Sequence, residues 1–76
     1  MNKVRRARVD EAIERLQELQ SEIEDILREE YEYRDNIPEN MQQSEKYETA
    51  DSNCNCLQNA CDSIDECIDQ LEESKA

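Results

Sequence analysis

Residues 9–33 read VDEAIERLQELQSEIEDILREEYEY and carry apolar side chains at alternating steps of three and four. The stripe has one polar interruption, Glu30, and two further apolar residues, Ile13 and Leu27, widen it on one side. Its members are Val9, Ala12, Leu16, Leu19, Ile23, Ile26 and Tyr33. This spacing is typical of the seam of a coiled-coil helix. The sequence therefore predicts a first helix over residues 9–35.

A second stripe of the same kind runs through residues 47–71. Its members are Tyr47, Ala50, Cys54, Leu57, Cys61, Ile64, Ile68 and Leu71. The sequence predicts a second helix over residues 44–74, with Ser44 as its N-cap. Residues 51–59 are rich in Ser and Asn, which are poor helix formers, so a later start capped by Asp51 or Ser52 is the alternative. The unbroken register of the stripe favours a single helix.

Residues 36–43 separate the two predicted helices and read as a loop. Pro38 disfavours the helical conformation of the residue before it, which ends the first helix. If the chain reverses near residue 40, the two stripes face each other and Arg15 lies near Asp65. The predicted fold is all-α, a two-helix antiparallel coiled-coil hairpin, preceded by a basic N-terminal arm of residues 1–8.

The chain has 76 residues, no Gly and a single Pro, which disfavours strands with tight turns and indicates one helical domain. A hairpin this small buries little apolar surface, so we expect self-association. The predicted assembly is a homodimer that packs as a four-helix bundle. Ile13, Leu27 and Cys67 are expected on the exposed flanks of the stripes. The predicted oligomer seam comprises Ile13, Leu16, Leu19, Ile23, Leu27, Leu57, Ile64 and Ile68.

The net charge is −12, although the first eight residues carry four cations and no acid. An acidic surface repels nucleic acid and anionic membranes and attracts basic patches of proteins. The basic arm is either a weak nucleic-acid contact or, as favoured here, a partner for the acidic C-terminal end. We expect a protein partner, no direct nucleic acid and no membrane. The absence of a secretory signal and of a long apolar run predicts a cytoplasmic protein.

Two groups of residues are candidates for partner binding. Tyr33 and Tyr47 are expected to face each other beside the loop, with Tyr31 and Met41 nearby. These side chains form either a plug that closes the hairpin or an aromatic hot spot for a partner. The acidic surface supplies the second group. The complete candidate set is Tyr31, Tyr33, Met41, Tyr47, Asp62, Glu66 and Asp69.

The four cysteines do not form a recognisable site. Cys54 and Cys61 are seven residues apart, about 10.5 Å along a helix, which is too far for a disulfide within one chain. The chain has no His to complete a zinc site. Small buried side chains are the favoured interpretation of both cysteines. A metal or redox role and an intermolecular disulfide are the alternatives.

A second metal candidate is an EF-hand-like pattern in residues 51–62. Its oxygen-bearing residues include Asp51, Asn53, Asn55 and Asp62. Cys56 stands where such a loop needs Gly, and Asp62 stands where it needs Glu. No metal and no cofactor are therefore expected. Catalysis is not expected either, because the chain lacks His and a Gly-rich phosphate loop.

Residues 33–48, YRDNIPENMQQSEKYE, lie between a Glu-rich first helix and a second seam helix. This run resembles a group of small proteins carried by low-GC Gram-positive bacteria, their phages and mobile elements. The resemblance covers about residues 9–72 and implies a helical hairpin of mobile-element origin. The second helix of that group is typically Ala- and Glu-rich, whereas Cys and Asn occupy several of those positions here. The group has no established activity to carry over.

The sequence thus favours a small acidic binding protein without enzymatic activity. The first expectation is a phage or mobile-element inhibitor or regulator that engages a basic, nucleic-acid-binding protein, such as a host-defence nuclease. The alternative is a structural self-assembly or adaptor module that acts through its coiled-coil seam.

Overall fold

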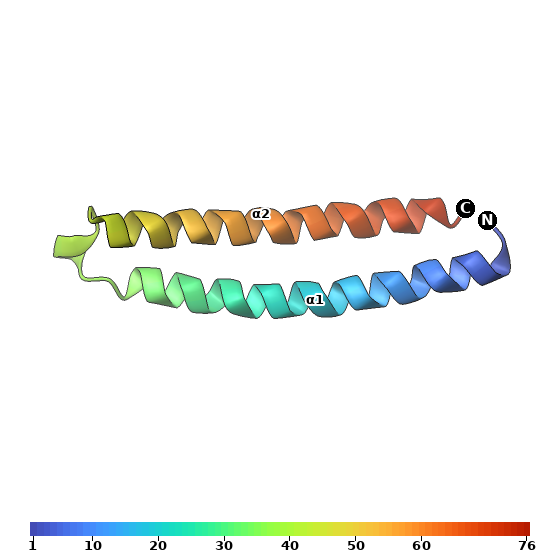
Figure 1. Cartoon of the computed structure of the whole chain (residues 1–76), viewed down its shortest axis with the longest axis horizontal. Helices are drawn as coiled ribbons and strands as arrows, with labels where there is room; N and C mark the ends of the chain where they lie inside the picture. Colours follow the sequence, from blue (N-terminus) through green and yellow to red (C-terminus); the bar gives the residue numbers. More distant parts are fainter.

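The computed structural model describes all 76 residues as two long α-helices joined by a loop (Figure 1). Helix α1 comprises Lys3–Asp35 and helix α2 comprises Glu45–Ser74, and the loop contains one short 3₁₀ turn, η1, at Glu39–Met41. The helices lie side by side and antiparallel, in a rod whose Cα atoms span 59 × 15 × 11 Å. The chain has no strand, so the predicted all-α hairpin is confirmed.

Helix α1 begins earlier than the apolar stripe indicated. Asn2 is its N-cap, and the Asn2 Oδ1 accepts a hydrogen bond of 2.8 Å from the backbone N–H of Arg5. Asn is among the preferred N-cap residues because its side chain satisfies a free N–H of the first turn. The prediction of a basic arm separate from the helix is therefore wrong. The cations of residues 3–8 lie on the first turns of α1.

Helix α2 begins where the sequence predicted. The Ser44 hydroxyl accepts a hydrogen bond of 3.3 Å from the backbone N–H of Tyr47, as expected of an N-cap. The helix continues without a break through residues 51–59 and ends at Ser74. The alternative start at Asp51 or Ser52 is wrong, because packing against α1 outweighs the poor helix propensity of this segment.

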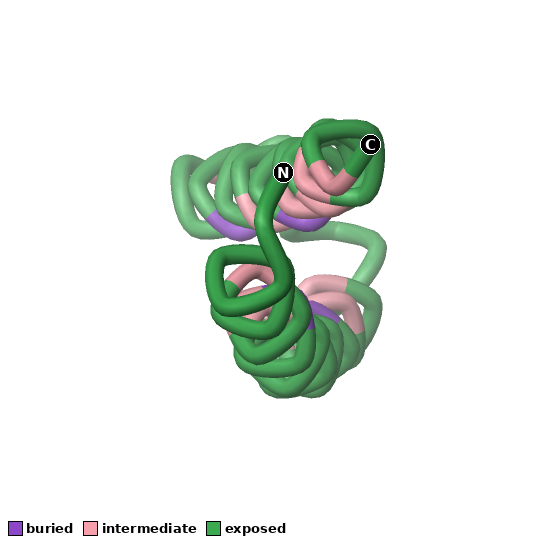
Figure 2. The backbone as a smooth tube through the Cα atoms, turned by 90° about the vertical axis from the view of Figure 1, so that its right-hand side faces the viewer, coloured by how far each residue is buried: buried purple, intermediate pink, exposed green.

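The core is a single contact layer between the two helices (Figure 2). Six residues are buried, which are Ile13, Leu27, Ile37, Ala50, Cys54 and Cys61. Ile37 comes from the loop, immediately before Pro38, and is only 6% exposed. The layer is therefore closed at the loop end by a residue outside both helices.

The rotation of α1 about its own axis differs from the predicted one. Ile13 and Leu27 were expected on exposed flanks but are buried against α2, 5 and 7% exposed. Leu19 and Ile26 were expected in the seam but keep about half of their surface exposed. The row of α1 that faces α2 therefore consists of residues 13, 20, 27 and 34. The hydrogen bonds of Gln20 and Arg34 to α2 explain this rotation.

Candidate functional site

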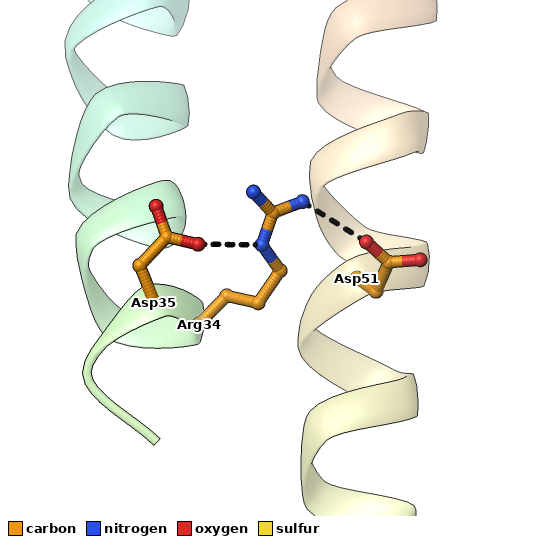
Figure 3. Close-up of polar contacts among 3 residues, drawn as sticks. All are labelled: Arg34, Asp35 and Asp51. Atoms are coloured by element: carbon orange, nitrogen blue, oxygen red, sulfur yellow. Dashed lines mark hydrogen bonds and ion pairs between the residues drawn. The ribbon is translucent and has the colours of Figure 1, made fainter. Parts of the chain in front are cut away.

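One side of the hairpin carries every side-chain hydrogen bond that joins the two helical arms, and we call it the bridged side. Near the loop, the Arg34 Nη1 donates to the Asp51 Oδ1 at 3.0 Å, and the Arg34 Nε donates to the Asp35 Oδ1 at 3.0 Å (Figure 3). The guanidinium carbon of Arg34 also lies 5.0 Å from the ring centre of Tyr31, within cation–π range. Arg34 is therefore held by both helices.

Two further contacts extend the bridged side toward the chain termini. The Gln20 Nε2 donates to the backbone carbonyl of Cys61 at 3.1 Å and to the Asp65 Oδ1 at 2.6 Å. The Lys75 Nζ donates to the Asp10 Oδ1 at 2.8 Å. Asp65 is thus bridged by Gln20, and no ion pair joins it to Arg15, which was expected to lie nearby. These contacts fix the two helices in register from one end to the other.

The cations of the bridged side are stabilised in their charged form. The hydrogen bond to Asp35, followed by that to Asp51, raises the pKa of Arg34. The hydrogen bonds to Asp10 and then Glu72 raise the pKa of Lys75. Both bridges therefore remain ionic from neutral pH up to at least the ordinary pKa of lysine.

The opposite side carries no such bridge and exposes an apolar row of α1, and we call it the open side. The row repeats every seventh residue and consists of Ala12, Leu19, Ile26 and Tyr33. Leu19, Ile26 and Tyr33 are 50, 49 and 47% exposed. At the end with the termini, Ala12 borders a surface depression shared with Leu71 of α2. At the loop end, Tyr33 borders a similar depression shared with Ala50.

Gln20 and Arg34 are the functional residues that the sequence interpretation missed. Both occupy the row that faces α2, where apolar residues were expected, and the apolar alternation instead selected the row of Leu19 and Ile26. The available signal was the seven-residue spacing of Ile13, Gln20, Leu27 and Arg34, which places both polar residues in one row with the two apolar ones. The carbonyl of Cys61 and the carboxylates opposite them explain why polar residues are accepted there.

The tyrosines of the loop end are divided between the two sides. Tyr31 lies against Arg34 on the bridged side. Tyr33 lies on the open side, where the Lys46 Nζ is 5.6 Å from its ring centre. Met41 borders a second depression with Tyr33 and Lys46 at the loop. Tyr47 is half-buried. The predicted group is therefore not one patch, and its exposed members are Tyr33 and Met41.

The cysteines fall into a buried and an exposed pair, all with free thiols. Cys54 and Cys61 are 1 and 4% exposed and face α1. Burial raises the pKa of both thiols, which disfavours the reactive thiolate. This arrangement supports the interpretation of both as small core side chains. Cys56 and Cys67 lie exposed on α2.

The metal candidates are held on a helix. Residues 51–62 are helical throughout, so the EF-hand-like pattern of Asp51, Asn53, Asn55 and Asp62 forms no loop. The carboxylate of Asp51 is bound to Arg34. No group of three or more His, Cys, Asp or Glu side chains is arranged to hold a metal ion.

The outer surface of α2 is an uncompensated acidic row. No Lys or Arg occurs between Tyr47 and Ser74. The row consists of the exposed residues Asp62, Glu66, Asp69 and Glu73, at helical steps of four, three and four. None of them forms an ion pair within the chain. No helix combines the length and apolar character that crossing a bilayer requires.

The hairpin thus presents three distinct surfaces, the bridged side, the open side and the acidic row of α2. The polar groups of the bridged side are paired within the chain. The apolar row of the open side is half exposed, and the carboxylates of the acidic row have no cation beside them. No protein-family model, curated protein or solved structure matches the chain.

Proposed function

We propose that this chain is a non-enzymatic interaction module whose acidic row binds a basic surface of a protein partner. The observation that carries the proposal is the row itself, four exposed carboxylates on a helix that has no cation over residues 47–74. The row runs from Asp62 to Glu73, about 16 Å of helix. A continuous negative strip of this length attracts basic surfaces and accelerates association with them.

The rigidity of the row supports the same proposal. Its carboxylates lie on a helix that runs beside α1 along its length (Figure 1), so the backbone that carries them is ordered before binding. Preorganised charges lose less conformational entropy on binding than charges on a flexible tail. The partner class that fits best is a nucleic-acid-binding protein, whose basic groove normally receives a row of phosphates. An inhibitor or regulator from a phage or mobile element would act in this way.

The test is capture of partners from a nuclease-treated host lysate with two variants as bait. One variant neutralises the acidic row with Asp62→Asn, Glu66→Gln, Asp69→Asn and Glu73→Gln. The matched control removes the same number of charges from the exposed surface of α1 with Glu11→Gln, Glu14→Gln, Glu18→Gln and Glu32→Gln. We expect wild type and control to capture the same basic protein, the row variant to lose it, and salt to release it. Equal capture by both variants would refute the proposal.

A second candidate function is self-assembly, and the open side favours it. A hairpin that leaves one apolar row of α1 exposed has the surface needed to pack against two further helices. We propose that the hairpin forms half of a four-helix bundle. Sedimentation equilibrium at micromolar concentration tests this directly, since the mass of a single chain would rule the bundle out. Assembly through an apolar surface is also expected to persist at high salt, unlike binding through the acidic row.

A further inference from the structure

The open side has the dimensions of a helix-packing surface. Its apolar row runs from Ala12 to Tyr33, about 32 Å of helix, and includes three large side chains that are each about half exposed. No charged residue interrupts the row itself. Large side chains that are half exposed at a seven-residue spacing on one helix form the pattern of a row that packs against another helix.

The hairpin is also incomplete as a folding unit. Only six residues are buried, in one layer between the helices. A second set of apolar residues remains half-buried beside that layer, which is Leu16, Ile23, Leu57, Ile64 and Leu71. A helix inside a four-helix bundle buries three neighbouring rows, not one. Two helices laid over the open side would cover both the half-buried set and the exposed row.

The charges beside the row indicate what covers it. The depression at Ala12 is bordered by three cations, Arg5, Arg8 and Arg15, and by a single acid, Glu11. Farther along α1, Glu22 lies beside Leu19 and Glu30 lies beside Tyr33. The α1 edge of the open side is thus basic near the termini and acidic toward the loop. A second copy has the complementary distribution when it is turned end for end.

We infer that a second copy of this chain closes the open side in an antiparallel orientation, with Leu19 of each copy opposite Ile26 of the other. This inference rests on the proposed four-helix bundle and specifies its geometry. The register places the small side chain of Ala12 opposite the large ring of Tyr33 from the second copy. It also places Arg15 beside Glu30 of the second copy. Two-fold symmetry makes each of these contacts twice.

A parallel pairing lacks these features. It places the cations Arg5, Arg8 and Arg15 beside the same cations of the second copy. It also places Glu30 beside its own equivalent, so like charges oppose each other at both ends of the interface. The ring of Tyr33 then meets another Tyr33 while Ala12 meets Ala12, which leaves a gap at one end. Charge and side-chain volume therefore both favour the antiparallel dimer.

The first experiment measures mass by sedimentation equilibrium over a range of protein concentrations. We expect wild type to reach the mass of two chains. The variant with Leu19→Ala and Ile26→Ala truncates four side chains per dimer, so we expect its dimer dissociation constant to rise by at least ~100-fold. Gln17→Ala with Glu24→Ala is the control, because both residues are exposed on α1 but lie off the row. Circular dichroism confirms that each variant remains helical.

The second experiment tests the orientation by exchanging charges. In the antiparallel dimer, Arg15→Glu alone places two acids together, and Glu30→Arg alone places two cations together. We expect each to weaken the dimer about tenfold, and the variant with both changes to recover most of that loss. A parallel dimer would show no such recovery, because it never brings the two positions together.

The outcomes separate this inference from the two proposals on which the function rests. The mass of a single chain, or a mass above two chains, overturns the dimer. A second outcome is that Leu19→Ala with Ile26→Ala abolishes the dimer, but the variant with both Arg15→Glu and Glu30→Arg is no stronger than either single charge change. This result keeps the four-helix bundle and overturns the antiparallel register. A dimer indifferent to the two truncations overturns the assignment of the surface. None of these results changes the test of the acidic row, which lies on the outer surface of α2.

Discussion

The bridged and open sides of the hairpin use neighbouring rows of the same helix, α1, but the two rows differ in polarity and in exposure. The row of α1 that faces α2 contains two apolar residues, Ile13 and Leu27, and two polar ones, Gln20 and Arg34. The open row contains only apolar members, and three of its side chains are about half exposed. The helix thus turns its more polar row toward α2 and leaves the large side chains of its more apolar row about half exposed.

Polar contacts explain this inversion. Gln20 and Arg34 find acceptors on α2, which are the carbonyl of Cys61 and the carboxylates of Asp65 and Asp51. Such contacts add little net free energy but disfavour other arrangements, because a rotation of α1 would leave those groups unpaired. The difference between the two sides indicates that hydrogen bonds determine the rotation of α1 about its axis, while apolar burial stabilises the contact between the helices.

The largest expected effect contrasts a buried and an open leucine. Leu27→Ala should lower the free energy of unfolding by about 2–5 kcal/mol, because it leaves a cavity in the core. Leu19→Ala should cost much less at protein concentrations too low for self-association, since the Leu19 side chain is half in water. Urea unfolding followed by circular dichroism measures both. Equal losses at low concentration would contradict the distinction between the two sides.

The next effect concerns the bridge near the loop. Arg34→Met keeps the aliphatic stem but removes the hydrogen bonds to Asp35 and Asp51, so the urea midpoint should fall. The control is Arg28→Met, which removes an exposed ion pair to Asp25 within α1 and should leave the midpoint nearly unchanged. Equal shifts for the two variants would show that bridging between helices adds nothing beyond a surface ion pair.

A smaller effect should appear at alkaline pH. The pKa of Cys54 and of Cys61 is raised by burial, so the unfolded chain loses its thiol protons at a lower pH than the folded chain. The folded state then holds more protons, and its stability should fall as the pH rises above about 9 under reducing conditions. Replacing both by Ala should reduce this slope. Replacing the exposed Cys56 and Cys67 is the control and should leave the slope unchanged.

The smallest effect is expected at the end of the rod that carries the termini. Lys75→Met removes the contacts with Asp10 and Glu72, but both carboxylates are about half exposed, so the urea midpoint at neutral pH should barely move. The raised pKa of Lys75 means that its small contribution is present below its ordinary pKa and lost as the pH rises through the folded value. A shift as large as that of Arg34→Met would show that the bridges are equivalent along the rod.

Most of the fold is predictable from the sequence, and its physical basis is local. The two apolar stripes, Pro38 and the Ser44 cap determine the helices, the loop and the start of α2. The basic start was missed because the Asn2 cap lies outside any apolar stripe. The rotation of α1 was missed because periodicity weighs only apolar residues, whereas Gln20 and Arg34 depend on groups distant in the sequence. The acidic row could be read directly from the absence of Lys and Arg over residues 47–74.

The absence of Lys and Arg from residues 47–74 affects how the hairpin opens. Helix α1 has basic side chains spaced among its acids, whereas the carboxylates of residues 47–74 repel one another without any cation between them. The same segment contains four weak helix formers, Ser52, Asn53, Asn55 and Asn59. Helix α2 therefore depends on α1 for its order more than α1 depends on it. Local opening is expected to begin in α2, so the amide protons of α2 should exchange with solvent faster than those of α1. Helix α1 stays helical during this opening, and α2 refolds by packing against it.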